Sequence, residues 1–276
     1  LPAERRYDDN MPLANVARLL PYHNYVTGER TVETINTMID YVQDGNRLFY
    51  DIYSDEDKRA DARKNNTGLF FFRGEPGKPF AIVCPGGGFS YVGAIHEGFP
   101  LAIALSKMGY NAFSIQYRTG SAQVACEDLA QAIDFIMRHA EELQVSTDDY
   151  SLWGGSAGAR MAAYLGSYST QGFIEATHER PATVIMGYTG HSEYTPDDPP
   201  TYVIIGEDDA IASPSTMRRR VKNLQALGID TEFHLLPDLR HGFGLGRGTT
   251  ADGWHEDAVR FWEKHISRKN GTSYRK

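Results

Sequence analysis

The chain has 276 residues, of which 28 are basic and 36 acidic, so its formal net charge at pH 7 is −8. An acidic surface repels phosphate backbones, and the one basic run, residues 218–220, lies within an amphipathic stretch, so nucleic acid is not an expected partner. Two cysteines, Cys84 and Cys126, cannot build a disulfide framework and are expected as small core residues. No apolar stretch reaches the length of a membrane span.

The first residue is Leu1 rather than methionine. We therefore expect that a signal or anchor segment, or a cloning remnant, has been removed. A secreted or cell-envelope location and a cytoplasmic location both agree with this sequence. The oligomeric state stays open.

Residues 1 to about 45 are polar, with helical patches such as 13–20, and we expect an irregular N-terminal arm rather than a separate domain. Strands are predicted at 47–53 and 69–73, with a charged loop or short helix over 54–66 between them. Residues 1–66 thus form an arm with the first strand, available to cover a pocket. Residues 67–276 form the core of what is one domain overall.

A regular alternation of short apolar runs and helical patterns begins at Phe80. Strands are predicted at 80–84, 111–117, 150–153, 182–186, 202–205 and 231–236, and helices at 97–108, 122–145, 157–168, 214–227 and 251–265. This alternation predicts an α/β fold whose mostly parallel sheet carries helices on both faces. Right-handed crossovers place the carboxyl ends of the strands at one edge, where ligands bind in such sheets.

Residues 154–158, Gly-Gly-Ser-Ala-Gly, are the one match to the pattern G-x-S-x-G. A strand is predicted before this motif and an alanine-rich helix after it, so Ser156 stands on a sharp strand-to-helix turn that exposes its hydroxyl. The flanking glycines avoid clashes in the turn, and the helix N-terminus favours developing negative charge. An ordinary N-cap serine is the alternative. The strand-turn-helix context favours Ser156 as a nucleophile.

A serine hydroxyl needs a base, and the chain contains nine histidines. His241 follows the predicted strand 231–236 in the loop 240–244, at the same edge of the sheet as Ser156. His96 and His191 lie in earlier loops that also lead to this edge. The chain order serine, acid, histidine favours His241 as the base.

The acid that orients the imidazole is sought after the strand 202–205, where Gly206 is followed by Glu207, Asp208 and Asp209. We favour Asp209, because the acid in such a loop usually stands three residues after the glycine that ends the strand. Asp208 is the alternative. Either carboxylate would fix the tautomer of the histidine and stabilise its positive charge.

Three glycines, residues 86–88, follow the predicted strand 80–84 directly. Their backbone N–H groups, with that of Ala157, are candidates to bind the oxygen of a tetrahedral intermediate. A phosphate-binding loop is excluded, because neither the G-x-G-x-x-G spacing nor a following Gly-Lys-Ser/Thr is present. Metal-ligand patterns such as H-E-x-x-H are absent too, so neither a metal nor a cofactor is expected.

Several aromatic residues lie near these motifs, and they either line a sugar or aryl pocket or pack the core. We take Phe89, Tyr91 and Phe243, together with His191, as candidate substrate-binding residues. Tyr117, Tyr188 and Tyr194 also lie near the motifs, and the same two roles, pocket lining or packing, stay open for them.

Four stretches together, 84–89, 154–158, 206–209 and 241–243, resemble the α/β-hydrolase superfamily. More narrowly, the chain is similar to the branch with bacterial acetyl-xylan and feruloyl esterases and their lipase- or esterase-like relatives. The resemblance covers about residues 67–266.

That resemblance implies a triad of Ser156, Asp209 and His241, with N–H donors at Gly87, Gly88 and Ala157. Pro85 stands where the hormone-sensitive-lipase branch carries histidine, which argues against that branch. Only residues 187–200 separate two strands where other branches insert a cap, so no large cap is expected.

The leading hypothesis is a serine carboxylic-ester hydrolase that works through an acyl-enzyme. Its expected substrates are short acyl groups such as acetyl, carried by a saccharide or a small alcohol. Arylformamidases and serine peptidases use the same triad and glycine loop, so cleavage of a C–N bond is the alternative. A non-catalytic binding protein on this fold is disfavoured, because such proteins commonly lose the serine or the histidine.

Overall fold

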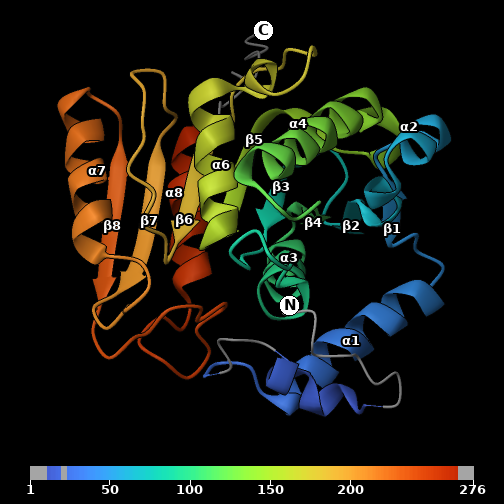
Figure 1. Ribbon diagram of the computed structural model, residues 1–276, viewed down its shortest axis with the longest axis horizontal. Coiled ribbons are helices and arrows are strands. Elements are labelled where there is room, and N and C mark those ends of the chain that lie inside the picture. Colours follow the sequence, from blue (N-terminus) through green and yellow to red (C-terminus); the bar gives the residue numbers. More distant parts are fainter. Residues whose placement is uncertain (1–10, 20–23, 267–276) are drawn as a thin grey trace, which may run out of the picture.

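One eight-stranded sheet, in the order β1-β2-β4-β3-β5-β6-β7-β8, organises the computed structural model, which describes residues 11–19 and 24–266 (Figure 1). The strands are β1 (Phe49–Asp51), β2 (Gly68–Phe72), β3 (Pro79–Cys84), β4 (Asn111–Gln116), β5 (Ser146–Gly155), β6 (Thr183–Gly187), β7 (Thr201–Gly206) and β8 (Thr231–Leu236). β2 is antiparallel to both β1 and β4, whereas the pairs from β4 through β8 are all parallel. The predicted mostly parallel sheet is confirmed.

Helices cover both faces of the sheet (Figure 1). They are α1 (Gly28–Gln43), α2 (Asp55–Ala60), α3 (Phe99–Lys107), α4 (Ala122–Arg138), α5 (Ala140–Leu143), α6 (Ala157–Tyr168), α7 (Pro214–Ala226) and α8 (Trp254–His265). Short turns add η1 (Leu13–Leu19), η2 (Ala62–Asn66), the π-helical η3 (Ala94–Gly98) and η4 (Thr170–Gly172). β6 and β7 are joined without a helix, so the expected absence of a large cap at that point is confirmed.

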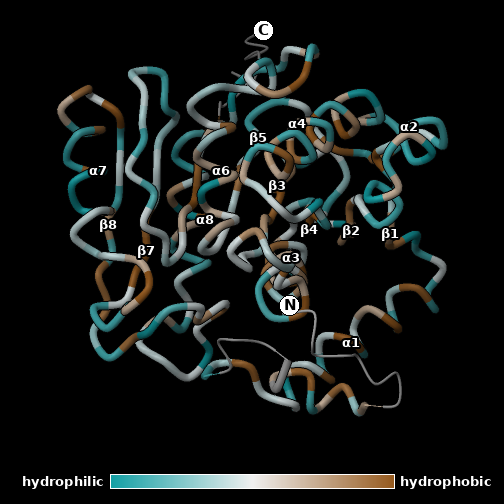
Figure 2. The backbone as a smooth tube through the Cα atoms, viewed as in Figure 1, coloured by the Kyte–Doolittle hydropathy of each residue, from teal (hydrophilic) through white to brown (hydrophobic). Residues whose placement is uncertain are grey.

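Two hydrophobic clusters hold the helices to the sheet, one on each face. Alternation along β3 sends Phe80 and Ile82 into the cluster with α4, α6 and α7, and Ala81 and Val83 into the cluster with α3 and α8. Figure 2 shows the apolar strands at the centre and polar residues along the outer helices. Within the described residues, no helix is both long and apolar enough to cross a bilayer.

Both cysteines are unpaired and buried, as expected. Cys84 ends β3, and Cys126 lies on the inner side of α4. Leu1, on which the expectation of a removed segment rests, lies outside the described residues.

The expectation that residues 1 to about 45 are irregular is wrong for residues 28–43, which form α1. Thr27 caps this helix by accepting a hydrogen bond from the N–H of Arg30. Its buried side is made by Thr31, Thr34 and Met38. The apolar residues Val32, Ile35, Ile39 and Val42 follow a helical spacing, so the sequence does carry a signal for this helix.

The predicted long helix 122–145 is interrupted at His139, whose φ of −112° and ψ of 18° leave the helical region. α4 therefore ends at Arg138, and a single turn, α5, follows. β5 begins at Ser146, four residues before the strand expected at 150–153. By contrast, α6 and β8 have the predicted bounds.

Arg118, just after β4, joins the N-terminal part of the chain to the core. Its guanidinium lies 2.7 Å from Asp128 of α4 and 3.1 Å from Asp61, between α2 and η2. Asp128 is fully buried and also accepts hydrogen bonds from the Arg118 backbone N–H, at 2.6 Å, and from the Tyr53 hydroxyl, at 2.6 Å. Removing one member of such a network leaves the other buried charge uncompensated.

We expect Asp128→Ala to lower the free energy of unfolding by about 3 kcal/mol, because Arg118 loses its main buried partner. Chemical denaturation monitored by circular dichroism measures the change. Asp197→Ala is the matched control, since Asp197 pairs with Arg180 at an exposed site, and we expect a loss below about 1 kcal/mol there. Equal losses in the two variants would contradict this account of the network.

Candidate active site

Ser156 lies in the sharp turn between β5 and α6, as predicted from its motif. Its φ of 52° and ψ of −116° are rarely adopted by residues with a side chain. The turn leaves no room beside it, because a Cβ on Gly158 would lie 1.8 Å from the carbonyl oxygen of Cys84. Glycine at position 158 therefore allows α6 to begin directly against β3.

Ser156, His241 and Asp209 are brought together at the carboxyl edge of the sheet from three separate loops. The Nε2 atom of His241 lies 2.9 Å from Oγ of Ser156. Its Nδ1 atom lies 2.8 Å from Oδ2 and 3.0 Å from Oδ1 of Asp209. Both His241 and Asp209 are buried, whereas Asp208 is exposed. Between the two predicted acids, the structure thus sets Asp209 against the imidazole.

The backbone holds Asp209 in place. Its Oδ1 atom accepts hydrogen bonds from the N–H groups of Ile211, at 2.9 Å, and Ala212, at 2.7 Å. A carboxylate that is fixed in this way accepts a hydrogen bond from the Nδ1–H of His241, which leaves the lone pair of Nε2 directed at the serine hydroxyl. The arrangement can therefore remove the proton of Ser156.

The glycine loop after β3 passes directly beside Ser156. A Cβ on Gly86 would lie 3.0 Å from Cβ of Ser156, and one on Gly87 would lie 2.0 Å from the carbonyl oxygen of Tyr91. Gly87 has a φ of 134° and Gly88 a φ of 60°. Such backbone conformations and close approaches suit glycine.

Ala157 opens α6, so its N–H group belongs to the first helical turn, where no intrahelical acceptor exists. Together with the glycine loop, it borders the Ser156 hydroxyl. The assignment of Gly87, Gly88 and Ala157 as donors to a reaction intermediate stays a prediction.

A small buried network beside this loop was missed in the sequence. The N–H group of Gly86 donates a hydrogen bond to the carboxylate of Glu97, and Tyr188 lies beside Glu97 at the same small cavity. In the sequence Glu97 reads as the first residue of an ordinary helix. Its contact depends on the π-helical turn η3 that precedes α3, for which the sequence carries no recognisable signal.

Phe89 and Tyr91, two of the predicted substrate-binding residues, are half-buried beside the glycine loop. The Arg160 guanidinium, one turn after Ser156, lies 5.9 Å from the centre of the Phe89 ring. Tyr91 lines an open cavity at the carboxyl edge of the sheet. Both positions are compatible with contact to a bound molecule.

The other two predicted substrate-binding residues, Phe243 and His191, are buried. The Phe243 ring packs edge-on against Tyr188, with 4.5 Å between ring centres. The His191 ring is edge-on to Tyr164, and burial, followed by the charges of Arg220 and Arg160, lowers the pKa of His191 to about 3. His191 is therefore neutral and packed in this structure, and a substrate role for either residue stays a prediction.

The open cavity has a volume of about 980 Å³ and begins at Ser90, two residues after the glycine loop. The N-terminal part of the chain supplies one wall of it, and residues 90–93, η3 and the end of β4 supply the other. Ser156, Asp209 and His241 do not line this cavity. Its lining comprises Val16, Phe49, Arg63, Asn65, Asn66, Thr67, Phe70, Ser90, Tyr91, Val92, Gly93, Ala94, Ile95, His96, Phe99, Gln116, Tyr117, Arg118 and Thr119.

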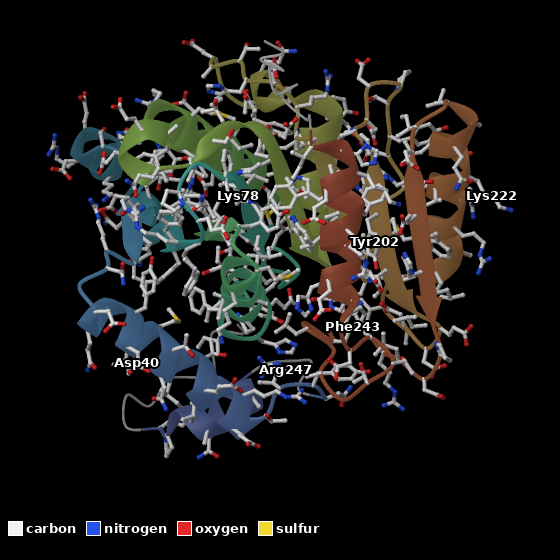
Figure 3. The ribbon with its side chains drawn as sticks, turned by 180° about the vertical axis from the view of Figure 1, so that it is seen from behind. Asp40, Lys78, Tyr202, Lys222, Phe243 and Arg247 are labelled. Atoms are coloured by element: carbon white, nitrogen blue, oxygen red, sulfur yellow. The ribbon has the colours of Figure 1, made fainter. Side chains whose placement is uncertain are left out.

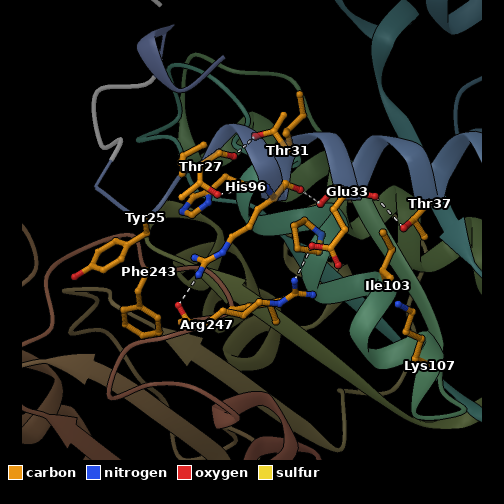
Figure 4. A pocket seen from close by; sticks show the side chains of 17 residues that line it. Tyr25, Thr27, Thr31, Glu33, Thr37, His96, Ile103, Lys107, Phe243 and Arg247 are labelled. Atoms are coloured by element: carbon orange, nitrogen blue, oxygen red, sulfur yellow. Dashed lines mark hydrogen bonds and ion pairs between the residues drawn. The ribbon is translucent and has the colours of Figure 1, made fainter. Parts of the chain in front are cut away.

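A second, narrower cavity of about 50 Å³ lies between α1 and the loop after β8 (Figure 4). Seen from behind, the labelled residues Phe243 and Arg247 of that loop lie near the N-terminal helices (Figure 3). Arg247 forms an ion pair with Glu33 at 2.9 Å and accepts a hydrogen bond from the Arg30 side chain at 2.8 Å. The loop that carries His241 is thus attached to α1.

His96 lies between these two cavities and lines both. Its Nε2 atom is 2.7 Å from the carbonyl oxygen of Gly242, the residue after His241. The structure therefore gives His96 a contact with the predicted catalytic loop rather than with Ser156. Within the described residues, no group of three or more His, Cys, Asp or Glu side chains is arranged to hold a metal ion.

Comparison with known proteins agrees with this architecture. The family model BD-FAE matches residues 73–186. The structure of an α/β hydrolase from a Medee basin deep-sea metagenome is 22% identical with a TM-score of 0.63, over 72% of this chain and 92% of that one. The chain has the α/β-hydrolase fold.

Other similar proteins include proteins described as ester hydrolases. An acetyl ester-xyloside bifunctional hydrolase from Caldicellulosiruptor lactoaceticus is 19% identical with a TM-score of 0.70, over 79% of this chain and 97% of that one. A curated acetylxylan esterase from Xylanibacter ruminicola is 21% identical over 193 residues, 59% of this chain. The chain spans 40% of the length of that relative. The resemblance to the branch with acetyl-xylan and feruloyl esterases is confirmed.

Proposed function

We propose that this protein is a serine hydrolase that cleaves carboxylic esters through an acyl-enzyme. The observation that carries the proposal is the continuous contact from Ser156 Oγ to His241 Nε2, at 2.9 Å, and from His241 Nδ1 to Asp209, at 2.8 Å. A nucleophile, a base and an orienting acid at these separations are what acyl transfer requires. The esterases among the similar proteins add support.

The reaction follows from these positions. His241 takes the hydroxyl proton as Ser156 Oγ bonds to the ester carbonyl carbon, and Asp209 stabilises the resulting imidazolium. The N–H groups of Gly87, Gly88 and Ala157 stabilise the negative oxygen of the tetrahedral intermediate. When the intermediate collapses, His241 returns the proton to the departing alcohol. Water, deprotonated by His241, then releases the acid and regenerates Ser156.

Substrates of this reaction are short acyl esters, acetyl-like, of saccharides or small alcohols. The cavity of about 980 Å³, lined by the residues that follow the glycine loop, has room for an alcohol as large as a sugar. Its lining combines aromatic rings such as Phe49 and Phe70 with amide groups such as Asn65 and Gln116, a mixture that suits a hydroxylated ring. The described part of residues 1–66 would then serve as the cover of the substrate site.

Activity against a panel of acetylated xylo-oligosaccharides, p-nitrophenyl acyl esters and N-formylkynurenine tests the bond type. We expect turnover of the esters and none of the formamide. Preferential cleavage of N-formylkynurenine would replace the ester proposal by C–N hydrolysis with the same residues. No turnover of any substrate, with no labelling of Ser156 by a fluorophosphonate, would show a non-catalytic protein.

We expect kcat/KM to fall as the acyl chain lengthens beyond about four carbons. A long chain gains about 0.8 kcal/mol for each buried CH₂ only where an apolar tunnel at the nucleophile receives it, and the large cavity, although mostly apolar, is not lined by Ser156. A C2 to C12 p-nitrophenyl ester series measures the preference. A maximum at C8 or longer, or a jump in rate at the micellar threshold, would reveal a lipid-binding pocket instead.

A further inference from the structure

Glu97 and Tyr188 form a polar contact in the interior, next to the predicted catalytic residues and used by none of the steps above. Tyr188 follows β6 with a φ of 36°, a conformation that is strained for a residue with a bulky side chain. Its side chain borders one small cavity together with Glu97 and Gly244. Burial first, and then the Glu97 charge, raises the pKa of Tyr188 well above its usual value, so the hydroxyl keeps its proton.

The same carboxylate fixes the start of the glycine loop. It accepts the N–H of Gly86, while the carbonyl oxygen of Gly86 accepts the N–H of Gly93 at 2.9 Å. In a trans peptide the C=O of one residue and the N–H of the next point in opposite directions. The bond to Gly93 therefore sets the direction of the N–H of Gly87, one of the proposed oxyanion donors.

Glu97 is close to the nucleophile itself. A Cβ on Gly86 would lie 2.8 Å from Oε2 of Glu97 and 3.0 Å from Cβ of Ser156, so Gly86 is held between the two side chains. Glu97, Tyr188 and Gly244 border a small cavity of about 10 Å³. The Tyr188 ring packs edge-on to His241, with 5.3 Å between ring centres. One carboxylate thus connects the glycine loop with the loop that carries the base.

We propose that Glu97 is a positioning residue for ester hydrolysis, which holds the glycine loop in the geometry that binds the oxyanion and, through Tyr188, sets that loop against the His241 loop. This inference rests on the proposed function. Glycine residues rotate at low cost. Without Glu97, the peptide between Pro85 and Gly86 is held only at its carbonyl oxygen, by the Tyr117 hydroxyl at 2.7 Å, so the glycine loop loses part of its positioning and the donors that follow lose alignment. Stabilisation of the transition state is then lost, while the ground-state ester, which needs no oxyanion donor, still binds.

The test compares Glu97→Ala, Glu97→Gln and Tyr188→Phe with a matched control pair. The control is Tyr110 and Glu263, because the Tyr110 hydroxyl donates to a glutamate, at 2.7 Å, but at the amino end of β4. We expect Glu97→Ala to lower kcat about 100-fold with KM changed less than about 3-fold, the size of effect seen when an oxyanion donor is lost. Glu97→Gln keeps one acceptor oxygen, and it and Tyr188→Phe should each lose about 10-fold.

The control variants Tyr110→Phe and Glu263→Gln should keep kcat within about 2-fold. Affinity for a boronic acid, which forms a tetrahedral adduct on serine, should fall in step with kcat across the Glu97 series. If Glu97→Ala does not fold, Glu97→Gln and Tyr188→Phe carry the test, since they preserve shape.

Two results would overturn the inference: kcat values like those of the controls, or a loss confined to KM or to Tm. An inactive wild-type protein would instead overturn the proposed function. Turnover that depends on Ser156 but not on Glu97 would leave the proposed function standing and remove only the positioning role.

Discussion

Ser156→Ala should lower kcat at least about 10⁴-fold and leave the protein folded. The variant has no atom to form the acyl-enzyme, and the hydroxyl it lacks contacts the His241 ring at 2.9 Å. Alanine carries the same Cβ as serine, so the strain of a φ of 52° at this turn is unchanged. The change in stability is therefore limited to one hydrogen bond, about 1 kcal/mol.

Ser151→Ala is the matched control, because Ser151 is a buried serine of β5, the strand that leads to Ser156, and its hydroxyl lies 2.7 Å from that of Thr183. We expect this control to keep activity within about 3-fold while losing some stability. Fluorophosphonate should add one label to the wild type and to the control, and none to Ser156→Ala. A folded Ser156→Ala protein that hydrolyses esters well above background would end the assignment of the nucleophile.

Elements with strong local signals were predicted from the sequence. β8 and α6 have the predicted bounds, because a short apolar run and an alanine-rich helix are each bounded by turn residues. The meeting of Ser156 with Asp209 and His241 also followed from topology, since loops after parallel strands share one edge of the sheet. The choice of Asp209 over Asp208, by contrast, rested on the usual position of the acid in such loops.

Features that depend on contacts between distant segments were not predicted. The position of α1, though not its helical pattern, depends on bonds to Arg247, more than 200 residues away. The π-helical turn η3 aims Glu97 back at Gly86, and no composition or period signals such a turn. Residue type could not separate packing from binding either, since Phe243 is buried while Tyr91 lines the open cavity.

Asp209→Asn should lower kcat by about 10³- to 10⁴-fold, whereas Asp208→Asn should change it less than about 3-fold. Oδ1 of Asp209 accepts two backbone N–H groups, from Ile211 and Ala212. An asparagine must keep its carbonyl oxygen there, because an amide nitrogen cannot accept these bonds. In the wild type, Oδ2 of Asp209 lies 2.8 Å from Nδ1 of His241. In the variant, the NH₂ group takes the place of Oδ2 and faces Nδ1.

An NH₂ group that donates to Nδ1 selects the other tautomer, with the proton on Nε2. That nitrogen can no longer take the proton of Ser156, so the base is lost although every side chain keeps its place. Asp208→Asn removes the same charge from the same loop but on an exposed residue, which makes it the matched control. The measurement is kcat for a p-nitrophenyl acetate series from pH 5 to 10, with Tm for each variant. If Asp208→Asn loses activity while Asp209→Asn keeps it, Asp208 is the acid. The roles proposed for Ser156 and His241 would not change.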